Sequence, residues 1–221
     1  MRDFHPDDDV IFPKGYVPQA TPDDYDPGIP NQLLDFILRS EPTGSEPLES
    51  IDTDLFAVMK KRRSTRKFSD KPVETTKIDK IIAASDTAPT AGNFQGFEIF
   101  YIKSPEKKRS LVDACNYQSY VDAPVVLVFC KNPSRVKFNF PAYVLRKFAI
   151  QDATLTAGYS QLAAQALGLS SIWIGMFDEK KIMSILETNL VPSSILCLGY
   201  PEQTRFPKSR RNLKDLVNVV W

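Results

Sequence analysis

Residues 125–130 read Val-Val-Leu-Val-Phe-Cys, six apolar residues in a row with no polar position between them. Side chains of a strand alternate between two faces, so an unbroken apolar run is expected only where both faces are covered. The run therefore predicts a central strand with helices packed on either side of its sheet. Three further strands are predicted over Phe97 to Ile102, Ser171 to Phe177 and Ser194 to Tyr200.

Helical patterns separate these strands. Apolar residues at helical spacing predict helices over Asp54 to Arg63, Val73 to Ser85, Pro105 to Ala114, Tyr143 to Leu167 and Glu179 to Glu187. The longest is rich in Ala, Thr, Gly and Ser and is followed by Gly168, a pattern typical of a buried helix or one at a subunit interface. Because the strands are short and few, the predicted fold class is α+β, with helices sandwiching a small central sheet.

The first fifty residues differ from the rest in charge and proline content. Residues 1–50 hold eleven acidic residues against three basic ones and eight of the 17 prolines, although the whole chain has a net charge of +1. Proline at that density prevents a continuous helix or a central strand. We expect an extended or disordered arm over 1–50, with a short helix at most over 31–39, and a folded domain over 51–221. The arm could wrap a partner subunit, shield the mouth of an active site or stay disordered.

Composition argues against several classes of protein. Hydrophobic and charged contents of 43% and 25% are ordinary for a soluble globular chain. The cysteines Cys115, Cys130 and Cys197 show no Cys-x-x-Cys spacing, which disfavours a zinc site or a disulfide framework. The single histidine, His5, lies in the arm, which disfavours histidine-based catalysis or metal binding. No signal peptide or membrane-spanning run is present, so we expect a cytoplasmic protein with no metal and no membrane association.

A cationic run follows the first predicted helix. Six of the nine residues from Lys60 to Phe68 are Lys or Arg, and a second cationic cluster reads Lys208-Ser209-Arg210-Arg211. Guanidinium groups match phosphate oxygens with two parallel hydrogen bonds, and a serine hydroxyl adds a donor. The run alone could equally be a nucleic-acid patch or a solvated surface. The acidic arm would compete with nucleic acid for the basic body, which disfavours the nucleic-acid interpretation.

Two further segments have the composition of a ligand site. The segment Ala88 to Gly96 reads Ala-Pro-Thr-Ala-Gly-Asn-Phe-Gln-Gly and offers side-chain amides and backbone N–H groups to a planar heteroaromatic ligand. A plain connection between a helix and a strand is the alternative. In the segment Trp173 to Phe177, the glycine at 175 would let the backbone approach a ligand ring.

In this order the segments resemble the nitroreductase family of FMN-dependent oxidoreductases, over roughly residues 52–217. The matching motifs are Arg-Arg-Ser-x-Arg-x-Phe at 62–68, Ala-Pro-Thr-Ala-Gly-Asn-Phe-Gln at 88–95, the small-residue helix with Asp152 that runs to Gly168-Leu169, and Gly199-Tyr200-Pro201 with Pro207-Lys208-Ser209-Arg210. The resemblance implies an intertwined homodimer that binds FMN in a shared active site.

The resemblance also implies a role for individual residues. The FMN phosphate and ribityl chain would be held by Arg62, Ser64 and Arg66, with Arg63 in support and with Lys208 and Arg210 completing the phosphate site. The flavin bound mainly by the other subunit would be reached by Pro89, Thr90, Asn93 and Gln95. Asn116, otherwise an ordinary helix C-cap, would bond the pyrimidine edge of the ring, and Gly175 with Ile174 would bring a backbone N–H near the flavin N5.

The sequence departs from the family pattern at two positions. Gly96 stands where the family often has Pro, and Ser119 stands where some members carry Lys. The glycine loosens the loop without removing its amides. The serine removes one cationic contact to the flavin, which leaves the tuning of its redox properties and the choice of reductant open.

The implied activity is reduction of a nitroaromatic, a quinone or a similar small acceptor by NAD(P)H in a ping-pong cycle. No side chain is assigned as catalytic, because the flavin N5 accepts and delivers hydride. The segment Asn132 to Tyr143, with Phe138, Phe140 and Tyr143, is interpreted as a substrate lid, ordinary packing being the alternative. Rival functions are a ring-cleaving, dehalogenating or dehydrogenating flavoenzyme of the same fold, a non-enzymatic flavin-binding protein, and a structural dimer that has lost its cofactor.

Overall fold

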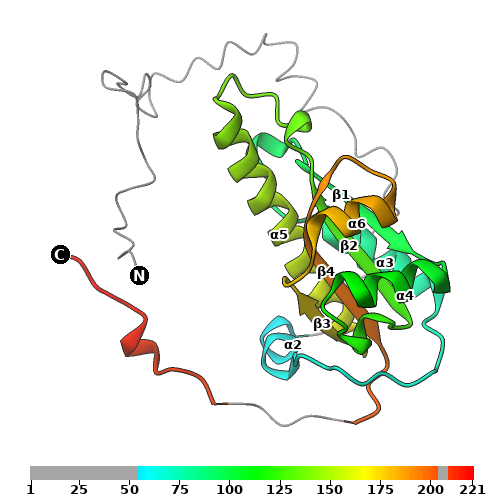
Figure 1. Ribbon diagram of the computed structural model, residues 1–221. Coiled ribbons are helices and arrows are strands. Elements are labelled where there is room, and N and C mark those ends of the chain that lie inside the picture. The colour runs from blue at the N-terminus through cyan, green and yellow to red at the C-terminus, as the bar shows by residue number, and fades with distance from the viewer. Residues whose placement is uncertain (1–53, 204–208) are drawn as a thin grey trace, which may run out of the picture. The chain divides into compact units, whose positions relative to one another are not determined.

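The computed structural model describes residues 54–203 and 209–221, and within them the strands form one antiparallel sheet (Figure 1). The strands are β1 (Phe97–Ile102), β2 (Val125–Lys131), β3 (Ser170–Ile174) and β4 (Val191–Gly199). Their order across the sheet is β1-β2-β4-β3, so β2 and β4 are interior and β1 and β3 are edges. The apolar run therefore forms an interior strand, as the sequence predicts.

Five α-helices surround the sheet in the described ranges. They are α2 (Leu55–Lys61), α3 (Thr75–Asp86), α4 (Pro105–Ala114), α5 (Ala142–Ala166) and α6 (Glu179–Leu186). Short 3-10 helices are η1 (Ala91–Asn93), η2 (Ser119–Val121), η3 (Pro133–Arg135) and η4 (Leu213–Asp215). The predicted arm over 1–50, with its short helix over 31–39, lies outside the described residues.

Alternation along β2 divides the core into two layers. Val126 and Val128 belong to a buried cluster with residues of α4 and α6, whereas Leu127 and Phe129 belong to a second cluster with residues of α3 and α5. All four side chains are fully buried. Burial of such a side chain contributes about 1.5–3 kcal/mol, so a strand covered on both faces is strongly stabilised. The predicted α+β sandwich of helices around a small sheet is confirmed.

Element boundaries differ from the sequence prediction where long-range contacts intervene. Helix α2 ends at Lys61, and Arg62 already has an extended backbone with ψ of 131°. Strand β3 ends at Ile174 and does not reach Phe177, because its pairing with β4 runs only from Ser170 opposite Gly199 to Ile174 opposite Ile195. Strand β4 begins earlier than predicted, since its pairing with β2 extends to Val191.

Helix α5 is buried along one stripe and exposed along another. Ala149, Ala153 and Ala157 are fully buried against the sheet, whereas Ile150 and Leu155 each keep 43% of their surface exposed. The buried apolar residues fit the interpretation as a buried helix, and the exposed ones fit the interpretation as a helix at a subunit interface. None of the helices in the described ranges combines the length and hydrophobicity that crossing a bilayer requires.

The cysteines behave as small buried hydrophobes. Cys115, Cys130 and Cys197 are free and fully buried. Burial raises the pKa of the Cys115 thiol to about 11 and that of Cys130 to about 12, so both stay protonated and unreactive at neutral pH. Within residues 54–203 and 209–221, His, Cys, Asp and Glu side chains form no cluster that could hold a metal ion.

Candidate functional site

The cationic segment leaves α2 in an extended conformation and docks on the edge strand β3. The Thr65 N–H donates to the Ser171 carbonyl oxygen over 2.9 Å, and Ser64 pairs with Ser171 as a parallel bridge. Side chains of an extended segment alternate in direction. Thr65 is accordingly buried, while its neighbours Ser64 and Arg66 are exposed. Arg62, Ser64 and Arg66 therefore share one side of the segment.

Positive charge is concentrated around Arg62. The pKa of Arg62 is lowered, first by burial, which disfavours the charged guanidinium, and then by repulsion from Arg210 and Arg63. Arg210 thus contributes to the positive charge that acts on Arg62, although the two are far apart in sequence. In the described part of the chain, neither they nor Arg66 form an ion pair with a carboxylate. A bound anion would relieve this repulsion. Lys208 lies outside the described residues.

Arg63 has a different structural role from its neighbour Arg62. Its Nη1 donates to the carbonyl oxygens of Lys60 and Arg62, each over 2.6 Å. Its Nε is buried without a hydrogen-bond partner. The Arg63 side chain thus bonds the backbone where α2 gives way to the extended segment, which suits the predicted supporting role.

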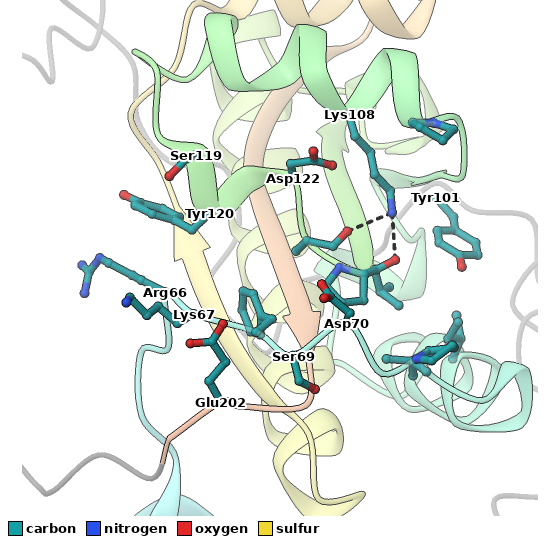
Figure 2. A pocket seen from close by; sticks show the side chains of 18 residues that line it. Arg66, Lys67, Ser69, Asp70, Tyr101, Lys108, Ser119, Tyr120, Asp122 and Glu202 are labelled. Carbon is teal, nitrogen blue, oxygen red and sulfur yellow. Dashed lines mark hydrogen bonds between the residues drawn. The ribbon is translucent and has the colours of Figure 1, made fainter.

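A chain of contacts joins three of the predicted motifs. The Arg66 guanidinium lies 5.6 Å from the ring centroid of Tyr120, and Figure 2 shows these side chains beside one another. The Tyr120 hydroxyl donates to Gln118 Oε1. Gln118 Nε2 donates to the carbonyl oxygens of Cys115, over 2.7 Å, and Met176, over 3.3 Å. The cationic segment, the loop of Asn116 and the segment of Gly175 are therefore neighbours.

The cavity next to Arg66 has a volume of about 660 Å³ and contains Lys108 (Figure 2). Lys108 Nζ donates to the carbonyl oxygens of Ala123 and Pro124, each over 2.8 Å. Burial lowers the pKa of this ammonium group. The bonded lysine satisfies backbone groups at the entry to β2, which is a structural role.

The loop after α4 has an uncommon backbone. Asn116 and Tyr117 are consecutive left-handed residues, with φ of 55° and 58°, and the Tyr117 N–H donates to Val112 O over 2.9 Å. The C-cap of α4 is Cys115, and Asn116 is the left-handed residue directly after it, one position beyond the cap that its alternative interpretation predicts; it remains exposed. An exposed residue at this position can still direct its side-chain amide toward a ligand.

At the end of β3, Gly175 presents its backbone groups to solvent, whereas the Ile174 side chain is buried. Ile174 is 97% buried in the core, so its side chain is not available to a ligand. Gly175 is exposed, and a Cβ built on it would come no closer than 3.9 Å to Trp173 Nε1. The protein itself thus leaves space at Gly175, where the backbone could approach a flat ligand.

The loop before β1 is strained and closed on itself. Gly92, Asn93 and Gln95 have φ of 56°, 57° and 47°. The Gln95 N–H donates to Thr90 Oγ1 over 3.2 Å, and Gln95 Nε2 donates to Asn93 Oδ1 over 2.6 Å. Pro89 is exposed at the start of this loop. Backbone strain persists only where surrounding structure enforces it, and it is concentrated at functional sites.

The two groups of predicted residues lie at opposite edges of the sheet. The cationic segment bridges to β3, whereas the loop of residues 88–96 leads into β1. Three strand spacings, about 14 Å in total, separate these edges. The structure therefore brings together Arg62, Ser64, Arg66, Asn116 and Gly175 but leaves Thr90, Asn93 and Gln95 at the other edge.

The predicted lid contributes to an aromatic cluster. Phe138 lies 5.1 Å from Phe94 of the strained loop and 5.4 Å from Phe140, measured between ring centroids. Phe138 and Phe140 each lie 6.1 Å from Phe148 of α5. Tyr143 lies outside these ring contacts and lines a separate cavity of about 730 Å³ with Lys131 and Arg146.

The sequence matches the model of one protein family. The model of the nitroreductase family matches residues 59–119 and 113–200. The chain belongs to the nitroreductase family. This span contains the Arg62–Arg66 segment, the strained loop, the loop of Asn116 and Gly175.

Individual relatives of this nitroreductase-family chain carry related names. An FMN reductase [NAD(P)H] of Bacillus subtilis is 29% identical over 172 residues, which cover 71% of this chain and 69% of the relative. An NADH dehydrogenase of Thermus thermophilus is 28% identical over 191 residues, covering 73% and 92%. The structure of the NADPH:FMN oxidoreductase from Vibrio harveyi complexed with NAD+ superposes with a TM-score of 0.71 at 25% identity, covering 76% of this chain and 77% of that one.

Two residues of this nitroreductase-family site carry contacts that the sequence did not assign. Gln118 bridges the loop of Asn116 to Met176, and the buried Asp152 of α5 bonds the strained loop. Both side chains form hydrogen bonds with backbone groups, and the residue types in the sequence do not indicate such partners. The sequence marks Asp152 as an acidic residue within the small-residue helix of the family pattern, but it does not indicate which groups the carboxylate bonds.

The positive φ and the close neighbours of Gly92 predict the effect of adding a methyl group there. Gly92→Ala would place a Cβ 2.5 Å from Phe138 Cζ at a positive φ, so we expect a loss of roughly 1–3 kcal/mol in the free energy of unfolding. Gly175→Ala is the matched control and should stay within about 0.5 kcal/mol of the parent protein. Urea unfolding at one protein concentration measures both. Equal midpoints for the two variants would contradict the strain expected of Gly92→Ala.

Proposed function

We propose that the protein is an FMN-dependent oxidoreductase that uses NAD(P)H to reduce a nitroaromatic, a quinone or a similar small acceptor. The observation that carries the proposal is the arrangement of Arg62, Ser64 and Arg66 on one side of the extended segment that pairs with β3. A phosphate monoester is the ligand that matches this donor set. The names of the Bacillus subtilis FMN reductase and the Vibrio harveyi oxidoreductase support FMN and NAD(P)H as the partners.

The residues of the chain would bind and orient the cofactor. Arg62, Ser64, Arg66 and Arg210 would hold the phosphate and ribityl chain, and exposed Asn116 would bond the pyrimidine edge. The exposed backbone at Gly175 would donate toward the ring. When bound, FMN supplies a ring nitrogen that accepts and releases hydride. The chain's own contribution is therefore position and charge, and we assign no side chain as a catalytic acid or base.

We further propose a homodimer with a shared site. The loop carrying Thr90, Asn93 and Gln95 lies at the sheet edge opposite Gly175, so a second copy would supply it to a flavin held at the cationic segment. Exposed large apolar side chains support such an interface. On α2 and α5 they are Leu55, Phe56, Met59, Tyr143, Ile150, Leu155 and Tyr159.

The rival functions differ in what supports them. A nucleic-acid patch needs cations that are free to meet phosphates, but the Arg63 guanidinium bonds the backbone carbonyl oxygens of Lys60 and Arg62. Loss of the cofactor is disfavoured because Arg62, Ser64 and Arg66 keep a shared, exposed side. A cytoplasmic location and a domain over 51–221 remain predictions.

The visible spectrum and steady-state kinetics test the function. The purified protein should show flavin absorbance near one FMN per chain. It should oxidise NADH or NADPH with a nitroaromatic or quinone acceptor, and double-reciprocal plots should be parallel, as a ping-pong cycle requires. A yellow protein without turnover would leave a flavin-binding protein or another flavoenzyme of the fold. A colourless protein that rejects added FMN would overturn the proposal.

The cationic segment predicts a selective effect on FMN affinity. Arg62→Ala removes a charge-assisted contact worth roughly 1.5–3 kcal/mol, so the dissociation constant for FMN should rise by roughly 10- to 150-fold. Lys61→Ala removes an equal charge one residue away, on exposed α2, and should change it little. Fluorescence titration of the apoprotein with FMN measures both. Similar losses in the two variants would indicate a general charge effect and contradict a specific phosphate contact.

We retain the lid as a proposal and narrow it to the aromatic cluster. Phe140 is 41% exposed and touches Phe138, so Phe140→Ala should change the ratio of kcat/KM between a quinone and a nitroaromatic by roughly tenfold. Tyr143→Ala, outside the cluster, should change this ratio less. If Phe138→Ala and Phe140→Ala both left acceptor preference untouched, the lid assignment would be wrong.

A further inference from the structure

Helix α5 carries one buried carboxylate. Asp152 is 98% buried among small residues of the helix, including Ala149, Ala153 and Thr156. In the described part of the chain it forms no ion pair with a Lys or Arg. A buried charge without such a partner is unfavourable unless hydrogen bonds stabilise it. The contacts of its two oxygens therefore indicate what the residue does.

Both oxygens of Asp152 bond the strained loop before β1. The Ala91 N–H donates to Oδ1 and the Gly96 N–H donates to Oδ2, each over 3.0 Å. These donors lie at the two ends of the stretch that contains Gly92, Asn93 and Gln95, the residues with positive φ. One side chain thus fixes both ends of the turn. Charge-assisted bonds of this kind are stronger than neutral ones.

Gly96 is matched to this carboxylate. A Cβ at position 96 would lie 2.9 Å from Asp152 Oδ2 and 2.8 Å from Val136 Cγ2, so a side chain there would displace one of them. Proline would also remove the N–H group that donates a hydrogen bond to Oδ2. The glycine that departs from the family pattern therefore gives this chain both the donor and the space that the second bond requires.

We propose that Asp152 is a positioning residue for the flavin site. It holds the loop in the strained conformation that presents Thr90, Asn93 and Gln95 to the ring, without touching the ring itself. The inference rests on the proposed function, because that function gives the loop its ligand. It goes further by assigning the geometry of the loop to one buried carboxylate on α5.

Asp152→Asn tests the proposal in the full-length protein. The amide has one acceptor oxygen, and its NH2 group would face the remaining backbone N–H, so one bond is lost and a repulsive contact replaces it. We expect amide hydrogen exchange in the peptide over 88–96 to accelerate by about tenfold and the dissociation constant for FMN to rise by about tenfold. Exposed Asp113 on α4 provides the matched control, Asp113→Asn, which should change neither.

A second variant changes the loop side of the same contact. Gly96→Ala keeps the charge of Asp152 but crowds Oδ2, so it should raise the exchange rate and the FMN dissociation constant in the same direction. It decides the question if Asp152→Asn does not fold. Affinities are compared at a temperature where each apoprotein is folded by circular dichroism, which removes a general loss of stability from the comparison.

The outcomes separate the two proposals. Faster exchange with weaker FMN binding supports the positioning role. Faster exchange with unchanged FMN affinity would make Asp152 merely structural and overturn it, and so would wild-type exchange in both variants. A parent protein that binds no FMN overturns the proposed function, and with it the flavin role of Asp152, although the exchange data would still report whether the carboxylate orders the loop.

Discussion

The cationic segment is attached to the edge strand β3 by the hydrogen bond from the Thr65 N–H to Ser171 O, and it is held further along by the pairing of Phe68 with Pro201. Because the segment is extended there, this bond sets which side chains face outward. Arg62 and Arg66 share the exposed side with Ser64. A shift of one residue would exchange these side chains for Arg63 and Thr65. Strand β3 then continues to Ile174, so the same attachment sets the distance from the guanidinium groups to the exposed backbone of Gly175.

Strain in the described backbone is concentrated where ligand contacts are expected. Asn93, Gln95, Asn116 and Tyr117 have positive φ, and Glu187 is the only other non-glycine residue with this feature in residues 54–203 and 209–221. Each such residue costs of order 1–3 kcal/mol, which the two-sided core of the sheet must offset. The loops are held by hydrogen bonds to Asp152 and Gln118 rather than by their own sequence preferences. Rigid helices and strands thus impose geometry on loops that would otherwise relax.

The sequence predicts the parts of this fold that depend on local pattern. The predicted bounds of β1 and α4 agree residue for residue with the structure, because the apolar patterns that predict them are local. The end of β3 could not be predicted, since its pairing with β4 stops at Ile174 while the apolar pattern continues. The local pattern predicts a helix through Arg62 and Arg63. In the structure the helix ends at Lys61, because the following segment is extended and pairs with the distant strand β3. The contacts of Asp152 could not be predicted for the same reason, because its partners are backbone N–H groups far away in sequence.

The distribution of perturbed ionisation fits chemistry carried by a bound cofactor rather than by side chains. An enzyme that relies on acid–base groups tunes their pKa toward neutrality within its site. Here burial raises the pKa of the thiols, which are enclosed in the core, and near the candidate site burial lowers the pKa of the cations Arg62 and Lys108. A guanidinium cannot exchange a proton near pH 7, but it can fix an anion. Under the proposed function, the site would hold and orient a charged ligand, and its selectivity would arise from the backbone at Gly175 and from the strained loop that Asp152 bonds.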